Sequence, residues 1–539
     1  MTSTLHTFGE PLLTSAQLRE VESANAQIDL MRRAGKAAAE FLTARTTPDS
    51  RIVLFAGPGN NGGDALACAA ELAQAGYAPK VILLGDPEKF GEDAARAWRR
   101  VLELLGSSNA SGSAPSPLAG EGWGEGEVGS TRDLSSSIQA PPLPQPLSLR
   151  GSGGQIAVLR EIPAAISADW IIDGLFGIGL KRPLDGVYRN AVRAIASARA
   201  GGAKVLALDV PSGVDADTGA ILGEAVVAAD FTLTFIANKP GLVTGPALDY
   251  VGELSCASLD VQPLAQQQNM AHWLDATYLD AARLAPSANA HKGSHGTCVI
   301  IGGANGMLGA ALLASRAAMR TGAGKVKVGW LAEPHPQVDP LMPEVMMGSA
   351  TELINSEGHA FVIGCGLGVS GAAVRLLKSA LKRDVPMVID ADALNLIAQS
   401  APLATALQKR KFPAIITPHP AEAARLLGCS TADVQRDRLK AAHDLATRYR
   451  CIAVVKGAGT VVCDATATTV NKTGNPLLAT AGTGDVLAGM IGALLAQGYD
   501  AATAARLGVC MHGAAADALR ARSVQRAVAS DIIDTLSTL

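Results

Sequence analysis

The chain alternates short apolar runs with amphipathic stretches, and this pattern occurs in two separate blocks. The apolar runs are too short for helices and are predicted to be buried strands. In the first block they lie at 51–56, 80–84, 168–173 and 204–209, with helices expected at 61–75 and 189–200. In the second they lie at 297–301, 325–331, 361–364, 386–389, 414–417 and 451–455, with helices at 309–320, 486–497 and 501–519. Such alternation predicts two α/β units, each a mostly parallel sheet between helical layers.

The length of 539 residues also calls for more than one domain. A polar stretch at 262–269 separates the two blocks, so we divide the chain at residue 265 into domains 1–265 and 266–539. The segment 107–154 is rich in Gly, Ser and Pro and has no helical or strand period. It is predicted to be a disordered insertion, with a functional lid as the alternative.

Composition argues against several classes of protein. Charged residues make up 18% and the net charge is -3, so neither nucleic acid nor an anionic membrane is an expected partner. No signal peptide precedes the first block and no apolar run approaches the roughly 20 residues needed to span a bilayer. We therefore expect a soluble, cytoplasmic protein. The eight cysteines form no CxxC pair, which favours reduced thiols, with disulfides as the alternative.

The first candidate site begins at a glycine-rich turn, Gly-Pro-Gly-Asn-Asn-Gly-Gly-Asp at 57–64, between a predicted strand and helix. Backbone N–H groups in such a turn can hold a phosphate. The spacing is not GxGxxG and there is no Walker lysine. The alternative is a tight turn in which Asn and Asp cap the helix.

Two further strand ends carry acids, in the stretches 173–183 and 209–215, which begin with Asp173 and Asp209. Ligands of open α/β sheets bind at the carboxyl ends of strands. An isolated acid there is often only a cap. Two acids together with the glycine-rich turn instead predict a convergent polar site.

These three motifs, in this order, resemble the NAD(P)H-hydrate epimerase domain over most of residues 10–260. The resemblance implies a Rossmann-like three-layer fold and a site for hydrated nicotinamide nucleotide. It implies that the substrate contacts Asn60, Asn61, Gly62, Gly63, Asp64, Gly177, Ile178, Gly179, Leu180, Lys181, Arg182, Pro183, Tyr188 and Asp209. It also implies a potassium ion held by Asn61, Asp173 and Ser212, whose oxygen atoms suit a hard cation.

Asp209 is the candidate acid/base of the epimerisation, because a carboxylate at a buried strand end can have a raised pKa. The alternative is that Asp209 only orients the substrate. One departure from the family is Ala65, where a glycine is usual.

The second candidate site lies in the stretch 474–489, where Gly482-Thr483-Gly484-Asp485 precedes a predicted helix. N–H groups at this helix start would face an anion. Asp485 could take a proton from a substrate hydroxyl while these groups stabilise the transferred phosphoryl group. The alternative is that Thr483 or Asp485 merely caps the helix.

This stretch resembles the ribokinase-like superfamily. With the glycines around Cys365 and the acids at 390–395, it resembles more narrowly the NAD(P)H-hydrate dehydratases over residues 275–539. The resemblance implies that the hydrated cofactor contacts Ala310, Gly368, His419 and Asp485. It implies that the adenine nucleotide contacts Lys456, Gly457, Ala458, Gly459, Thr460 and Gly484. Glu422 could organise magnesium, and Cys365 stands where the family usually has Pro.

The two resemblances together imply metabolite repair of hydrated NADH and NADPH. The first half would interconvert the two epimers, and the second would dehydrate one of them with ADP and magnesium, releasing AMP and phosphate. We also expect a homo-oligomer. The alternative is a kinase for a small alcohol or vitamin precursor, preceded by a non-catalytic binding domain.

Overall fold

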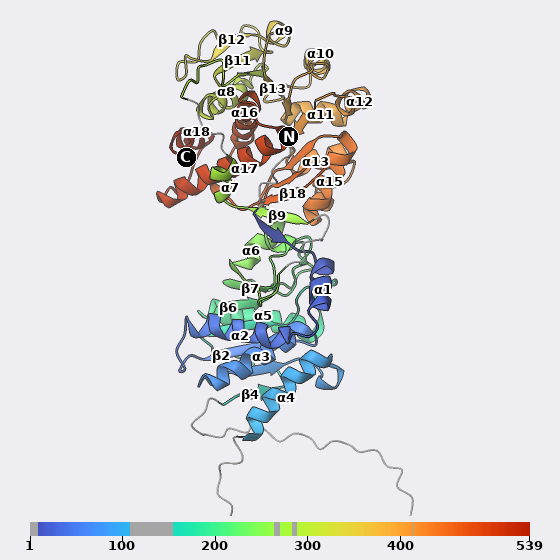
Figure 1. The fold of residues 1–539 in the computed structure, drawn as a ribbon, viewed down its shortest axis with the longest axis vertical. Coiled ribbons are helices and arrows are strands. Elements are labelled where there is room, and N and C mark those ends of the chain that lie inside the picture. The colour runs from blue at the N-terminus through green and yellow to red at the C-terminus, as the bar shows by residue number, and fades with distance from the viewer. Residues whose placement is uncertain (1–8, 108–154, 263–269, 283–287, 413) are drawn as a thin grey trace, which may run out of the picture.

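The computed structural model describes residues 9–107, 155–262, 270–282, 288–412 and 414–539. It contains two α/β domains stacked end to end, with strands β1 (Glu10–Leu12) and β9 (Ala271–Leu274) at the junction (Figure 1). None of the helices in the described ranges has the length and apolar character to traverse a bilayer.

The first domain is built on a fully parallel sheet in the order β4-β3-β2-β5-β6-β7-β8. Its strands are β2 (Ile52–Ala56), β3 (Lys80–Leu83), β4 (Ala157–Leu159), β5 (Trp170–Gly174), β6 (Lys204–Leu208), β7 (Phe231–Phe235) and β8 (Glu253–Ala257). Its longer helices are α1 (Ser15–Ala24), α2 (Leu30–Thr43), α3 (Asn60–Gln74), α4 (Glu92–Ser107) and α5 (Gly186–Ala200). The strand order reverses between β2 and β5, and ligands of such sheets bind at that point.

Alternate strand residues bury against helices on opposite faces of this sheet. Leu54 of β2 belongs to a cluster with Leu42 of α2 and Leu66 of α3. Its neighbour Phe55 belongs to a second cluster with Ile195 of α5. The domain therefore has the predicted three layers.

The second domain contains a larger, mixed sheet in the order β1-β9-β18-β17-β16-β15-β14-β13-β10-β11-β12. The strands after β9 are β10 (Thr297–Gly302), β11 (Lys325–Trp330), β12 (Met346–Ser349), β13 (Ala360–Ile363), β14 (Met387–Ile389), β15 (Ala414–Ile416), β16 (Ile452–Val455), β17 (Val461–Cys463) and β18 (Thr468–Asn471). One face packs on α7 (Thr277–Ala282), α8 (Leu308–Arg320), α16 (Thr483–Ala496), α17 (Ala501–Ala521) and α18 (Ala529–Thr535). The other packs on α9 (Ala350–Leu353), α10 (Gly371–Ala380), α11 (Ala391–Ala398), α12 (Ala401–Gln408), α13 (Pro420–Leu427), α14 (Thr431–Arg436) and α15 (Arg438–Tyr449).

Strand β1 precedes the first domain in sequence but belongs to the sheet of the second. It pairs antiparallel with β9, where Glu10 lies opposite Trp273 and Leu12 opposite Ala271. A single cut at residue 265 would therefore remove one strand from the second sheet.

The predicted strand and helix runs all coincide with elements of the structure, to within a few residues at their ends. The two-domain α/β fold class is confirmed. The predicted insertion at 107–154 lies outside the described residues, apart from Ser107 at the end of α4. All eight cysteines are free, as predicted; Cys256 and Cys429 are exposed and the other six are buried.

Candidate active sites

The glycine-rich turn of the first domain connects β2 to α3. A Cβ atom at Gly62 would lie 2.0 Å from the carbonyl oxygen of Gly57, so only glycine fits there. The helix is preceded by Gly59, and no side chain caps its first turn. The alternative of a turn capped by Asn and Asp is therefore wrong. The uncapped N–H groups at this helix start provide a place for an anion.

Asn61, in the first turn of α3, is buried although neither polar atom of its amide has a hydrogen-bond partner among the described residues. A buried unpaired amide needs an explanation, because its desolvation costs about 1–3 kcal/mol. A Cβ at Gly177 would lie 3.4 Å from Asn61 Cγ and 3.2 Å from Asp209 Oδ2. The structure thus brings Asn61, Gly177 and Asp209 together, as predicted.

Asp173 and Ser212 form a second group at the ends of β5 and β6. The Asp173 carboxylate accepts hydrogen bonds from the Ser212 backbone N–H (2.8 Å) and hydroxyl (2.7 Å). Burial raises the pKa of Asp173 to about 6, although these hydrogen bonds oppose the rise. Such a carboxylate would gain from a nearby cation. The potassium ion stays a prediction; the carboxylate, hydroxyl and amide oxygens of Asp173, Ser212 and Asn61 are of the kind that suits such a hard cation.

Asp209 follows β6 with a positive φ of 62°. Its Oδ1 accepts hydrogen bonds from Lys239 Nζ, Thr234 Oγ1 (3.3 Å) and the Phe235 N–H (3.3 Å). Its other oxygen, Oδ2, faces the Gly177 turn. The carboxylate is therefore fixed through one oxygen and presents the other to the space where the substrate is expected.

Sequence reasoning missed Lys239, whose side chain is only 1% exposed. Its Nζ also donates to Thr234 Oγ1 (2.7 Å) and to the Phe235 carbonyl (2.8 Å). It missed Glu22 as well, whose pKa is raised by burial and then by the charge of Asp209. Burial, followed by the charges of Asp209 and Glu22, also holds the pKa of Asp64 well above its usual range. A prediction of β7 would have drawn attention to Lys239, because it lies just beyond that strand's end.

The remaining predicted contacts of the first site differ in exposure. Leu180 is buried in the core, so only its backbone could meet a ligand. Lys181 is half-exposed and pairs with Asp215 and Asp217, each at 3.1 Å. Tyr188 packs edge-on against Phe176. The other predicted contacts are the buried Gly62 and Gly63, the half-buried Ile178, and the exposed Asn60, Gly179, Arg182 and Pro183.

The second site is centred on the start of α16. The residue before the helix, Gly482, has a φ of 89°, and no side chain caps the first turn. The Thr483 hydroxyl instead donates to the carbonyls of Leu478 (2.9 Å) and Thr480 (3.0 Å). The alternative that Thr483 or Asp485 caps this helix is therefore wrong. The helix start is left open to an anion.

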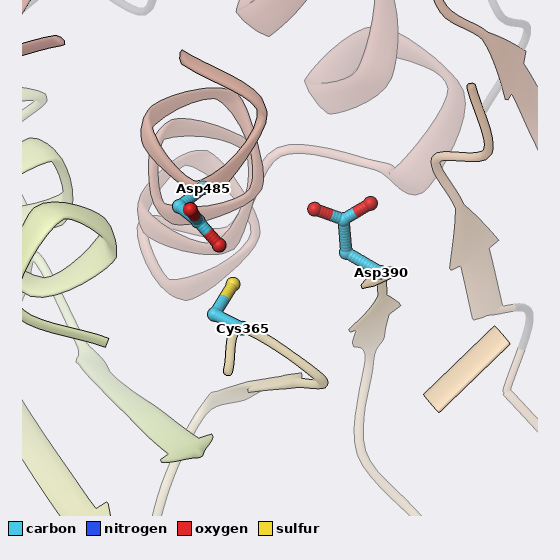
Figure 2. Close-up of side chains that lie close together, drawn as sticks. All are labelled: Cys365, Asp390 and Asp485. Atoms are coloured by element: carbon cyan, nitrogen blue, oxygen red, sulfur yellow. The ribbon is translucent and has the colours of Figure 1, made fainter. Parts of the chain in front are cut away.

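Asp485 lies in this first turn and meets two residues from strand ends (Figure 2). One ligand atom each of Cys365, Asp390 and Asp485 lies within 4.8 Å of the others. Burial, and then the charge of Asp390, raises the pKa of Asp485 to about 6, while a hydrogen bond from the Cys365 thiol opposes the rise. A carboxylate of that pKa is suited to accept a proton near neutral pH.

Lys456 supplies the positive charge of this site. Its Nζ donates to Asp390 Oδ1 at 2.7 Å and lies 3.2 Å from the position a Cβ would take at Gly484. Burial alone would lower the pKa of Lys456, but the charges of Asp390 and Glu422 raise it. Lys456 therefore points at the open helix start as a cation.

His419 has a structural contact that the sequence did not reveal. Its Nδ1 accepts hydrogen bonds from the N–H groups of Ala421 (3.1 Å) and Glu422 (3.3 Å), so it caps α13. The Glu422 carboxylate in turn accepts from the His419 N–H at 2.8 Å. Burial raises the pKa of Glu422. Ligand contact by His419 stays a prediction, and it would involve Nε2.

Two other predicted contacts, Gly368 and Ala310, lie in and beside the glycine-containing loop that follows β13. The Gly368 N–H donates to Asp392 Oδ2 at 2.8 Å. A Cβ at Gly366 would lie 3.1 Å from the Cβ of Ala310. His512 of α17 was missed: it is buried, and burial followed by the charge of Lys456 lowers its pKa to about 4.

The fold and these sites define a two-domain α/β protein with two helix starts that no side chain caps, each near a candidate acid/base carboxylate. A family described as NAD(P)H-hydrate dehydratase matches residues 298–538, and one described as YjeF-related protein N-terminus matches residues 27–241. The chain is 36% identical to the bifunctional NAD(P)H-hydrate repair enzyme Nnr of Coxiella burnetii, over 98% of this chain and 99% of that protein. It is 37% identical to the enzyme of the same name from Escherichia coli, over 95% and 89%. The chain belongs to the bifunctional NAD(P)H-hydrate repair enzymes.

A solved structure of the ADP/ATP-dependent NAD(P)H-hydrate dehydratase from Bacillus subtilis, co-crystallised with ATP and Mg²⁺, is also similar. It is 31% identical, covers 49% of this chain and 95% of its own, and superimposes with a TM-score of 0.45. The predictions of family, enzyme class and metabolite-repair function are confirmed by the relatives that match over nearly the whole chain. They support the kinase alternative less well.

Proposed function

We propose that the first domain interconverts the epimers of hydrated NADH and NADPH, and that the second dehydrates one epimer at the expense of ADP. The observation that carries this proposal is the pair of open helix starts, each facing a carboxylate that no helix cap accounts for. Full-length similarity to repair enzymes supports the same assignment.

In the first site, epimerisation requires a bond at the hydrated carbon to break and re-form on the other face, with proton transfer. Asp209 Oδ2 is the proposed acid/base, while Lys239 holds Oδ1 in place. Asn61, Asp173 and Ser212 would hold a potassium ion, which would supply positive charge beside the buried Asp173 carboxylate. The uncapped turn at Asn60–Asp64 would hold a phosphate of the substrate.

In the second site, the substrate hydroxyl is a poor leaving group. Asp485 takes its proton as the hydroxyl oxygen bonds to the terminal phosphorus of ADP, and the bond from that phosphorus to AMP breaks. The open start of α16 and Lys456 stabilise the transferred group. Loss of phosphate and of a proton from the neighbouring carbon then restores the ring double bond. The loop Lys456–Thr460 would hold the nucleotide, and Glu422 would organise magnesium.

The test is to supply a mixture of the two hydrated NADH epimers with ADP, magnesium and potassium. Complete recovery of NADH, measured by its absorbance, requires both activities. A plateau at the share of one epimer would show that the first domain does not interconvert them. A stable phosphorylated product without NADH would instead support the kinase alternative.

A further inference from the structure

A single buried segment, 239–245, reaches from one candidate site to the other. At its start, Lys239 Nζ contacts the Asp209 carboxylate. At its end, the Thr244 hydroxyl hydrogen-bonds the carbonyl oxygens of Gly459 (2.8 Å) and Ala458 (3.3 Å). The N–H of Gly245 also donates to the Ala458 carbonyl at 3.1 Å. Every residue of the segment is buried. The first domain therefore contacts the very loop that is proposed to hold the nucleotide.

The two backbones approach closely at this contact. A Cβ at Gly459 would lie 2.1 Å from the Val243 carbonyl oxygen and 2.7 Å from Thr244 Cα. Gly459 also has a φ of 60°, which favours glycine. A larger residue at this position would push the loop away from the first domain. The glycine of the nucleotide loop is thus explained by a contact between domains.

Arg438, at the start of α15, also packs against the loop. This side chain is buried, and its Nη2 donates to the Val455 carbonyl at 3.1 Å. A Cβ at Gly457 would lie 2.5 Å from Arg438 Nη1. Within the loop, the Thr460 hydroxyl donates to the Gly457 carbonyl at 2.9 Å. The loop therefore contacts both Arg438 and the first domain.

Apolar packing continues across the same contact. Leu242 and Val243 of the segment belong to one hydrophobic cluster with Val455 and Val461, which flank the loop. Closely packed groups transmit small displacements, because their neighbours have little free volume. The contact between domains is therefore a packed interface as well as a polar one.

We propose that segment 239–245 couples the two active sites and that Thr244 is a positioning residue for the nucleotide loop of the dehydratase. The proposal rests on the proposed nucleotide site at Lys456–Thr460. A loop held in its binding conformation loses less freedom when the nucleotide binds, so the affinity is higher. Coupling of this kind is reciprocal, so a bound nucleotide should also restrain the segment that carries Lys239.

The direct test replaces Thr244 by Val, which keeps the shape and removes the hydroxyl. Loss of this buried hydrogen-bonding group should raise the KM for ADP by about 5- to 30-fold. The kcat at saturating ADP should stay within about twofold of wild type, because Asp485 and the start of α16 are untouched. Thr244→Ser, which keeps the hydroxyl, should restore the KM.

The matched control is Thr232→Val in β7. Thr232 is equally buried, and its hydroxyl donates to the Val251 carbonyl at 2.6 Å, within the first domain. The Thr232→Val substitution should lower the free energy of unfolding without changing the KM for ADP. A similar rise in KM in Thr232→Val would attribute the effect to general destabilisation and overturn the proposal, as would an unchanged KM in Thr244→Val.

Hydrogen exchange tests the coupling itself. With ADP bound, amide exchange over 239–245 should slow in the wild-type protein and not in Thr244→Val. Equal exchange with and without ADP in the wild type would overturn the proposed coupling.

The Lys456→Met variant separates a failure of the proposed nucleotide site from a failure of the role proposed for Thr244. If Lys456→Met leaves the KM for ADP unchanged, the proposed nucleotide site fails too. If it raises the KM while Thr244→Val does not, only the role of Thr244 fails.

Discussion

The two candidate acid/base carboxylates are placed alike but partnered differently. Asp209 follows strand β6, and Asp485 lies in the first turn of α16. Each is near a helix start that no side chain caps. In the first domain, Lys239 contacts Asp209 itself. In the second, Lys456 contacts Asp390, and Asp485 meets a thiol instead.

This difference shows that a buried lysine can have two different effects on a nearby acid/base carboxylate. Placed directly on Asp209, it fixes the carboxylate and leaves one oxygen for the substrate. Placed on a neighbouring acid, it leaves desolvation to dominate at Asp485, whose pKa rises to about 6. The second carboxylate is thereby prepared to accept a proton, and the cation, although paired with Asp390, still lies beside the open helix start.

The largest expected effect is that of Asp485→Asn. Removing a general base that also borders the anion site should lower the dehydratase kcat by about 10³-fold. Epimer interconversion, followed by chromatography, should be unchanged because it takes place in the other domain. A dehydratase rate near wild type would remove Asp485 from the proposed chemistry.

Asp209→Ala should lower the rate of epimer interconversion by about 10²-fold or more, because the proposed proton transfer is lost. Dehydration of the reactive epimer should continue, as measured by recovery of NADH absorbance. An unchanged interconversion rate in a folded variant would contradict the role of Asp209. Lys239→Met tests the same site more selectively, because it keeps the Asp209 carboxylate but removes the Lys239 ammonium group that holds it.

Asn61→Ala should raise the potassium concentration needed for half-maximal epimerase activity by about tenfold, because one proposed ligand is lost. The dehydratase should show no such change. An epimerase that is indifferent to potassium in both proteins would argue against the ion. Ser197→Ala, on the surface of α5, provides a control.

The smallest effect concerns pH. With the pKa of Asp485 at about 6, the dehydratase rate should fall as pH drops through that value, because the protonated acid cannot accept a proton. The Cys365 thiol lowers this pKa, so Cys365→Ala should move the acid limb upward by a fraction of a pH unit. An unmoved limb would mean that the thiol does not act on Asp485.

The raised pKa of Asp485 also makes the free energy of unfolding depend on pH. Its folded-state pKa lies above the ordinary value of 3.8, so the folded protein binds more protons than the unfolded chain between about pH 4 and 6. The contribution of Asp485 to the free energy of unfolding therefore decreases as pH rises through this window. Asp485→Asn should lack that part of the pH dependence in denaturant titrations.

The sequence predicted the central strands well because both of their faces are buried. Such strands read as continuous apolar runs, as at β2 and β6. The strand β7, Phe-Thr-Leu-Thr-Phe, was missed because threonine interrupts the run. Lys239 was missed with it. The strand β1 has three residues and a partner far along the chain, so no local pattern predicts it.

The motifs of the candidate sites were easier to predict from the sequence than the side chains that contact them. The open helix starts follow from glycine spacing, which is local. The ion pair between Lys456 and Asp390 and the buried cation beside Asp209 depend on which strands become neighbours. His419 shows the converse, since its strand-end position suggested a ligand and did not reveal that it caps its own helix.

The place of β1 bears on how the protein is synthesised. This strand is translated before its partner β9, which starts at Ala271, and before the next strand of the sheet, β18, which starts at Thr468. Until β9 has been translated, near the middle of the chain, β1 has no partner strand, and until β18 follows, the β1–β9 pair has no sheet to join. The unpaired edge of such a strand can form hydrogen bonds with strands of other nascent chains. We therefore expect N-terminal fragments to aggregate more readily than the full-length protein.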